Sequence, residues 1–177
     1  MFETFEHTAN LGPRVTGDSL NDVFAEAAVG LISLIVAKVD SMDATKQRMI
    51  ELNSPNLEYR QVDWLSELLF FFESEGWLTA KASVKVAGKS MRRTVQGEIS
   101  CEDRHRRSLD VKAVTYHELS ILQQKRDGKS FRQAEVIVDT WMSRLGTVPS
   151  VKWQRGEHLV KRRALIGCQH HHHLRFC

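Results

Sequence analysis

The first regular pattern of apolar residues predicts an amphipathic helix over residues 20–35. Apolar residues recur there at steps of three and four, which places them on one helix face and leaves Asn21, Asp22 and Glu26 on the other. Ser19, with Asp22 three residues later, forms the capping-box signal of a helix start. We therefore expect this helix to face the core.

A second helix is predicted over residues 54–73. Ser54 supplies an N-cap, Pro55 follows at the first helical position, and Gly76 is expected to end the helix. Its apolar positions cover so wide an arc that we expect burial on more than one side. These positions are Val62, Trp64, Leu65, Leu68, Leu69, Phe71 and Phe72.

Elsewhere the pattern changes to the two-residue period of β-strands. Residues 82–86 and 94–98 flank a turn at Gly88, as expected for a β-hairpin. Four further segments have strand-like composition, and a turn at residues 126–128 joins the last two: residues 5–15, 48–52, 111–122 and 134–138. Two helices packed on a mainly antiparallel sheet predict an α+β, two-layer domain.

The regular pattern ends near Thr140. From Trp141 onward the apolar residues show no period, so we predict one domain over residues 1–140 and a basic, irregular tail over residues 141–177. The chain of 177 residues is 42% hydrophobic and 27% charged, which is ordinary for a globular domain and argues against a disordered or fibrous protein. No apolar run reaches the roughly 20 residues needed to span a bilayer, and the N-terminus lacks a secretory signal. We therefore expect a cytoplasmic protein without a membrane partner.

Charge is distributed unevenly between these two parts. Residues 141–177 contain seven Lys or Arg and one acid, Glu157, which gives a net charge of +6. The other 140 residues contain 18 basic and 21 acidic side chains, which gives −3. This asymmetry indicates separate roles or separate origins for the domain and the tail.

Two catalytic interpretations are weak. The glycines of the segment from Gly12 to Gly17 have the spacing of a phosphate-binding loop, but Asp18 stands where that chemistry needs a lysine. A turn and a helix cap explain these glycines better. Four possible nucleophiles or metal ligands have neither triad nor zinc-site spacing, and we interpret them as structural: His7, Cys101, His105 and His117. The odd number of cysteines, without a Cys-x-x-Cys pair, favours a reducing compartment.

Carboxylates at predicted strand ends are more interesting. Asp18, Asp110 and Asp139, with the amide of Asn10, have the oxygen ligands that calcium and magnesium prefer. Spacing leaves open whether these side chains converge on a cation or are separate, solvated strand ends. Taken alone, it favours solvated ends.

Three clusters could bind other partners. Residues 104–107 and 161–163 are rich in arginine and lysine, which can contact RNA phosphates, although a solvated loop and an incidental tail are the default interpretations of the two clusters. Residues 170–173 are four histidines that would bind nickel or zinc, or are incidental to the protein.

Five segments, in this order, resemble the archease family. They are His7-Thr8-Ala9-Asn10-Leu11-Gly12, Gly17-Asp18-Ser19-Leu20, Asp63-Trp64-Leu65-Ser66-Glu67-Leu68-Leu69, Val111-Lys112-Ala113-Val114-Thr115-Tyr116-His117 and Val136-Ile137-Val138-Asp139. The resemblance covers roughly residues 3–140, and residues 112–117 are its most specific part.

The resemblance implies a non-enzymatic partner of the GTP-dependent RNA ligase of tRNA splicing. Such a protein promotes guanylylation of the ligase and its multiple turnover, and meets tRNA only through the ligase. Another role implied for archease-like proteins is that of a chaperone or specificity modulator of a tRNA-modifying enzyme, such as a methyltransferase. A separate hypothesis, drawn from charge, is an RNA-binding module that acts through the tail.

The resemblance also implies a divalent-metal site, usually of calcium, at Asn10, Asp139 and Thr140. The family has aspartate at the first position and a chain end at the third, so this chain lacks two of the three negative charges and the site is expected to be weak or lost. Arg60 and Gln61 replace apolar residues that are common in the second helix of the family. We expect them to be more exposed here or to lower stability.

Overall fold

The computed structural model describes residues 1–7, 10–54, 56–88, 90–126 and 128–140, so the predicted tail lies outside the described residues. Its helices are α1 (Leu20–Ile35), a short 3-10 helix η1 (Val39–Ser41) and α2 (Leu57–Glu75). Its strands are β1 (Phe2–His7), β2 (Asn10–Gly17), β3 (Lys46–Asn53), β4 (Trp77–Ala87), β5 (Ser90–Ile99), β6 (Val111–Val114), β7 (Ser120–Arg126), β8 (Lys129–Glu135) and β9 (Val138–Thr140).

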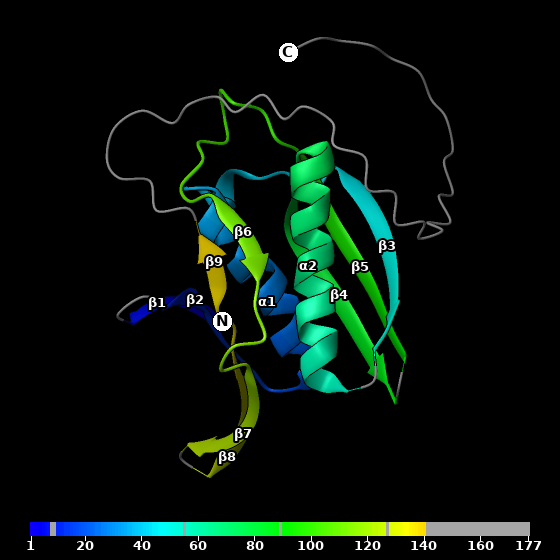
Figure 1. Ribbon diagram of the computed structural model, residues 1–177. Coiled ribbons are helices and arrows are strands. Elements are labelled where there is room, and N and C mark those ends of the chain that lie inside the picture. The colour runs from blue at the N-terminus through cyan, green and yellow to red at the C-terminus, as the bar shows by residue number, and fades with distance from the viewer. Residues whose placement is uncertain (8–9, 55, 89, 127, 141–177) are drawn as a thin grey trace. The chain divides into compact units, whose positions relative to one another are not determined.

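The strands form two antiparallel sheets (Figure 1). The larger sheet has the order β6-β9-β2-β8-β7, with β1 paired to β2, and the smaller has the order β3-β5-β4. Helix α1 contacts both β2 and β4, and α2 contacts both β4 and β6. The predicted α+β class, with two helices packed on antiparallel strands, is confirmed. The predicted sheet is divided into two, and the helices contact both.

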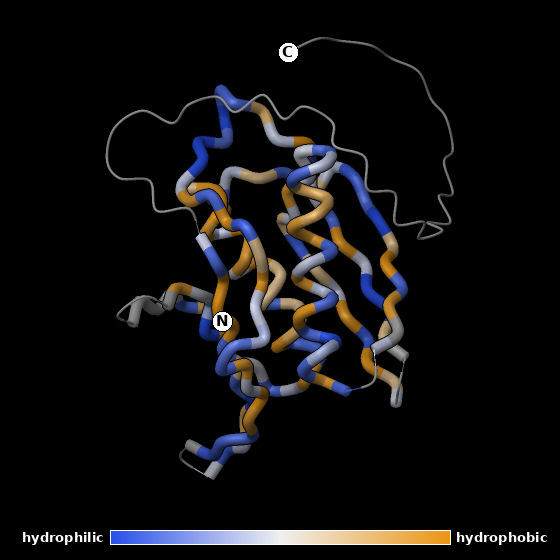
Figure 2. Tube along the Cα trace, viewed as in Figure 1, coloured by the Kyte–Doolittle hydropathy of each residue, from blue (hydrophilic) through white to orange (hydrophobic). Residues whose placement is uncertain are grey.

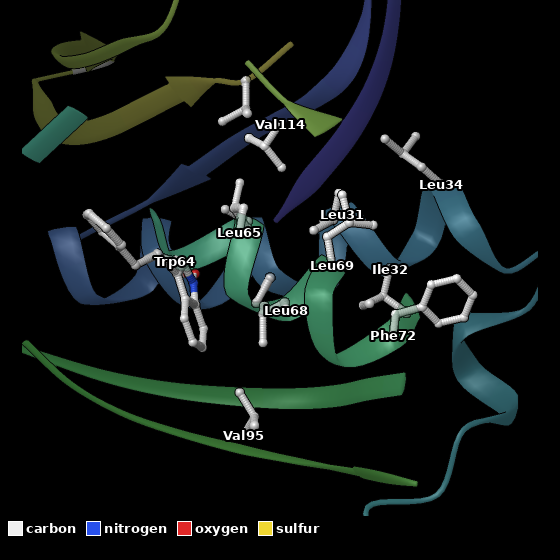
Figure 3. Close-up of a cluster of buried hydrophobic side chains, with 14 of the residues drawn as sticks. Leu31, Ile32, Leu34, Trp64, Leu65, Leu68, Leu69, Phe72, Val95 and Val114 are labelled. Carbon is white, nitrogen blue, oxygen red and sulfur yellow. Dashed lines mark hydrogen bonds between the residues drawn. The ribbon is translucent and has the colours of Figure 1, made fainter. Parts of the chain in front are cut away.

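Both helices are buried on several sides because each faces two partners. Trp64, Leu65 and Leu68 of α2 have no exposed surface, as expected from the wide apolar arc of this helix. Figure 3 shows side chains of α1, α2 and both sheets meeting in one cluster. The indole nitrogen of Trp64 donates to the Phe24 carbonyl oxygen at 2.9 Å and so joins the two helices.

The helix ends follow local capping chemistry. The predicted capping box of α1 is confirmed, because Ser19 Oγ accepts from Asp22 N and an Asp22 carboxylate oxygen accepts from Ser19 N. The predicted start of α2 at Ser54 is wrong: Asn56 is the N-cap, and its Oδ1 accepts from Tyr59 N at 2.8 Å. The hydroxyl of Ser54 instead donates to the carboxylate of Asp63.

Gly76 ends α2 as predicted. Its φ of 68° lies in the left-handed region, and its N–H donates to carbonyl oxygens of the last helical turn. A glycine suits this position because it has no Cβ to make the left-handed conformation unfavourable.

The N-terminal segment predicted as one strand over residues 5–15 is a hairpin. Strands β1 and β2 pair antiparallel from Phe2 opposite Val15 to His7 opposite Asn10. The two residues between them in the sequence, Thr8 and Ala9, are not the asparagine, aspartate or glycine that usually mark a two-residue turn. The sequence pattern therefore had no signal for the reversal.

The last two predicted strands are each interrupted. Strands β8 and β9 keep one register against β2, but the ladder breaks at Val136, whose N–H donates to Pro13 O at 3.3 Å. Pro13 has no N–H, so it cannot donate a second hydrogen bond to the other strand. The strand predicted over residues 111–122 is likewise divided, because residues 115–119 leave the sheet between β6 and β7 and Glu118 adopts a φ of 51°.

Hydrophilic and hydrophobic residues alternate along the strands of the smaller sheet (Figure 2). Met91, Arg93 and Val95 of β5 face the helices and are buried, while Arg92 faces outward. Arg60 and Gln61 are also buried, at 4% and 0% exposure, so the first of our two alternatives for them is wrong. The Arg60 guanidinium donates to Gly88 O at 2.8 Å and to Ser54 O at 3.3 Å, whereas the Gln61 amide has no hydrogen-bond partner among the described residues.

Candidate functional site

Three of the five motif segments lie on neighbouring strands, although they are far apart in the sequence. Strand β9 lies between β6 and β2, so it joins the motif of residues 111–117 to that of residues 7–12. The strands approach closely at Gly12, where an added Cβ would lie 1.7 Å from Val136 O. A glycine at this position is therefore required by the packing of one motif segment against another.

The predicted metal ligands lie at one end of this strand group. Leu11 of β2 pairs with Val138 of β9, and the same antiparallel register, carried one residue further, places the Asn10 backbone opposite Asp139. Thr140 pairs with Val111 at the start of β6. We call this region the strand-end site: Asn10, Asp139 and Thr140. The Asp139 side chain is exposed, and that of Asn10 lies outside the described residues.

The donor set of the strand-end site does not fit a tight calcium site. Asp139 is its only carboxylate, Asn10 has a neutral amide, and Thr140 has a hydroxyl and a main-chain carbonyl. Calcium affinity rises with the number of charged ligands, so one carboxylate is a poor match for a doubly charged cation. Among the described residues no three His, Cys, Asp or Glu side chains group as metal ligands.

The other two candidate carboxylates lie apart from each other. Asp18 follows the far end of β2, eight residues along the strand from Asn10, so the strand separates it from the strand-end site by roughly 26 Å. Asp110 directly precedes β6 and is therefore at the same end as Thr140. The pKa of Glu73, on α2, is raised by burial and by the negative charge of Asp110.

A pair of exposed tyrosines lies beside the most specific motif. Tyr116 follows β6 and packs on Tyr59 of α2, with ring centroids 5.1 Å apart and planes tilted by 50°. The side chains are 53% and 47% exposed, respectively. The pKa of Tyr116 is raised by partial burial and by the negative charge of Asp63. We call these residues the tyrosine pair.

The backbone after β6 is shaped by Thr115, which holds Tyr116 in place. Its N–H and its hydroxyl both donate to Ile137 O, at 2.9 and 3.1 Å, and His117 N donates to its hydroxyl oxygen at 3.3 Å. Sequence analysis missed Tyr59, because it is a single tyrosine near a helix start. Only the fold brings it to the motif of residues 111–117.

The histidine and cysteine candidates do not form a catalytic group in the described residues. His105 is buried, its Nδ1 accepts from Cys101 N at 2.9 Å, and its Nε2 lies 3.3 Å from Glu98 Oε1. These contacts stabilise the conformation of the loop after β5. His117 is exposed beside Glu118, and the side chain of His7 lies outside the described residues.

Arginines of the first basic cluster, residues 104–107, contact other side chains of the protein. Arg104 forms an ion pair with Asp43 at 3.1 Å and another with Glu98, and Arg107 lies over the Phe72 ring at 5.0 Å. These contacts favour a structural role for residues 104–107. The clusters at residues 161–163 and 170–173 lie outside the described residues. In the part of the chain that the structure describes, no helix is long and apolar enough to cross a membrane.

Comparisons with known proteins agree with this arrangement. The protein archease of Sulfurisphaera tokodaii is 33% identical over 124 residues, covering 68% of this chain and 87% of that protein. The protein archease of Methanothermobacter thermautotrophicus is 34% identical over 142 residues, covering 78% and 97%. The solution structure of protein 1598 of Methanobacterium thermoautotrophicum is 31% identical and superposes with a TM-score of 0.61, covering 78% of this chain and 97% of that one.

The family comparison covers the same part of the chain as the described fold. The sequence model of the archease protein family matches residues 2–140, which include all five motif segments and every described strand and helix. The chain belongs to the archease protein family.

Proposed function

We propose that this chain is a non-enzymatic protein partner of a GTP-dependent RNA ligase that joins tRNA halves. In this role it raises formation of the ligase-guanylate intermediate and lets the ligase turn over repeatedly. Family membership supports the proposal, and the observation that carries it is the meeting of three motif segments on β2, β9 and β6. Motif segments from distant parts of the chain are expected to meet in this way where a partner protein must recognise one surface.

The tyrosine pair is suited to the centre of a protein interface. Tyrosines are enriched among interface residues that contribute most to binding, because they bury a large apolar ring and keep a polar hydroxyl. Thr115 fixes the backbone on one side of Tyr116, and Tyr59 supports its ring on the other. Little side-chain freedom is therefore lost when a partner binds.

The test is a guanylylation assay with a purified GTP-dependent RNA ligase. Formation of ligase-guanylate is measured with labelled GTP and without RNA, and turnovers are measured separately with RNA substrate in excess, each with and without the full chain. We expect more ligase-guanylate and more turnovers with the chain present. No increase in either quantity would refute the proposed function.

A matched pair of variants locates the interface. Tyr116→Ala is expected to lower the apparent affinity for the ligase by about tenfold or more, which corresponds to about 1.4 kcal/mol or more. Phe70→Ala removes an aromatic ring that is 57% exposed elsewhere on α2 and should leave the affinity unchanged. Equal effects of the two substitutions would show that the tyrosine pair is not the contact.

We also propose that any divalent cation at the strand-end site is bound weakly. The single carboxylate of Asp139 supports this statement, because the other two positions contribute neutral oxygens. A partner of tRNA ligation is expected to work in the cytoplasm.

A further inference from the structure

The outward face of the smaller sheet has a polar groove of about 550 Å³. Its floor follows from the strand register, which places Lys81 of β4 opposite Gln96 of β5, Ser83 opposite Thr94, and Lys85 opposite Arg92. Lys81, Ser83 and Lys85 alternate with residues that face the helices, so all three project from the same face. We call this surface the sheet groove.

The charge of the sheet groove is positive and only partly balanced. Lys85 and Arg92 are directly opposite each other, and like charges at such a position destabilise a sheet. Glu51 is opposite Arg92 on the other side, but their closest atoms are 3.9 Å apart and both side chains are about 70% exposed. Among the described residues neither Lys81 nor Lys85 has an ion-pair partner, and no residue that lines the groove is acidic.

We propose that the sheet groove binds the phosphate backbone of RNA, so that the protein contacts RNA itself as well as its protein partner. The phosphate chemistry follows from the three cations, whereas the choice of RNA rests on the proposed function. Lys81 and Lys85 are four residues apart on one strand, so their Cα atoms are about 13 Å apart along it. That span is long enough for the groove to follow several linked phosphates.

The other lining groups determine what kind of contact the groove makes. The hydroxyls of Ser83 and Thr94 and the amide of Gln96 can hydrogen-bond phosphate oxygens and the 2′-hydroxyl of ribose. The groove lining contains no aromatic ring on which a base would stack. The groove therefore binds RNA through its backbone, without reading its sequence.

The experiment measures binding of the full chain to a labelled single-stranded RNA of about ten nucleotides, by fluorescence anisotropy at several salt concentrations. The test variant is Lys81→Gln, Lys85→Gln and Arg92→Gln combined. If each cation neutralises one phosphate, the variant reduces the slope of log affinity against log salt by about 2. If the two proteins bind equally at 1 M salt, this change in slope corresponds to a loss of affinity of about 100-fold at 0.1 M salt.

The control variant removes the same charge from another surface. Lys125→Gln, Lys129→Gln and Arg132→Gln lie on the β7–β8 hairpin, which extends away from the smaller sheet (Figure 1). Both variants keep all residues after 140, so the contribution of that segment is the same in each. We expect the control to keep most of the wild-type affinity and slope.

The outcomes are distinguishable from each other. A larger loss of slope for the groove variant than for the control supports the proposal, and single substitutions should each change the slope by about 0.7. Equal losses, or a larger loss for the control, overturn it. Thermal melts of both variants show whether they fold, and Lys85→Gln alone is expected to keep the fold because it removes the repulsion with Arg92.

The proposed function is tested separately, because RNA binding is measured without ligase and guanylylation without RNA. Stimulation of the ligase by the groove variant, together with wild-type RNA affinity, would overturn this inference alone. RNA binding by the sheet groove, with no stimulation of the ligase, would refute the proposed function alone.

Discussion

Replacing Arg93 by methionine is expected to stabilise the protein. Arg93 is on the inner face of β5 and has no exposed surface. Its Nε donates to Met91 Sδ at 3.0 Å, but its two terminal nitrogens have no hydrogen-bond partner among the described residues. The guanidinium also lies over the Trp64 ring at 5.2 Å. A buried cation with so few partners is costly, and methionine has a similar length without the charge.

The pKa of Arg93 indicates the size of this cost. Burial lowers the pKa well below its ordinary value, to about 10, although the negative charge of Asp63 opposes the change. One pKa unit corresponds to about 1.4 kcal/mol, so the charged guanidinium lowers the free energy of unfolding by about 3 kcal/mol. The lost contact with Trp64 offsets about 0.5–2 kcal/mol of the gain. We therefore expect Arg93→Met to raise the free energy of unfolding by about 1–3 kcal/mol at pH 7.

The pH dependence has a definite sign. Below pH 10 both the folded and the unfolded chain carry a protonated Arg93, so the full cost is present. Between pH 10 and the ordinary pKa of arginine, the unfolded state binds more protons than the folded state, so rising pH reduces the cost. The difference in stability between wild type and Arg93→Met should therefore be constant from pH 6 to pH 9, within about 0.5 kcal/mol.

The assay is urea denaturation at pH 7, followed by circular dichroism. Arg92→Met is the matched control, because this neighbour is on the outer face and is 69% exposed, and its effect should stay within about 0.5 kcal/mol. For a chain of this length a gain of 1–3 kcal/mol raises the melting temperature by about 2–12 °C. If Arg93→Met lowered the free energy of unfolding by more than about 1 kcal/mol, the buried guanidinium would be a net stabilising group and the reasoning refuted.

Three further predictions concern the strand ends and turns. Removing everything after Thr140 should change the melting temperature by no more than about 2 °C, measured by differential scanning calorimetry, because the last patterned strand ends there; loss of cooperative unfolding would contradict this. The same truncation combined with Asn10→Asp should produce a calcium-dependent rise in melting temperature that Asp139→Asn abolishes, and no rise would show that the metal ligands do not converge. Gly12→Ala should lower the free energy of unfolding by about 3 kcal/mol or more, because its methyl group would meet the backbone of a neighbouring strand, whereas Gly88→Ala, with open space around it, should cost about 1–2 kcal/mol.

Local signals in the sequence predicted the elements better than their arrangement. The capping box at Ser19 and the left-handed Gly76 depend on residues a few positions apart, so the ends of the helices near them were predictable. The start of α2 was misplaced because Ser54 and Asn56 are both good caps. Only the fold, which turns the Ser54 hydroxyl toward Asp63, distinguishes them.

The candidate site was predictable only where a family resemblance supplied the residues. The proximity of Asn10 and Asp139 depends on the pairing of the first and last motif segments, and periodicity within either segment contains no information about it. The tyrosine pair was missed for the same reason. The burial of Arg60 and Arg93 was also not predictable, because their charge favours the surface and only the register of the smaller sheet and the face of α2 direct them inward.

The register of β2 against β8 and β9 also bears on the order in which the protein folds. Strand β2 is made near the start of synthesis, and its partners on the side away from β1 are β8 and β9, the last described strands of the chain. The larger sheet therefore cannot close until almost the whole domain has been made, whereas the hairpin of β4 and β5 can form from neighbouring residues. Contacts of such long sequence separation slow folding, since a long loop must close before they form. Until then, this edge of β2 stays open to other chains, and a truncated product that lacks β8 and β9 would expose it permanently.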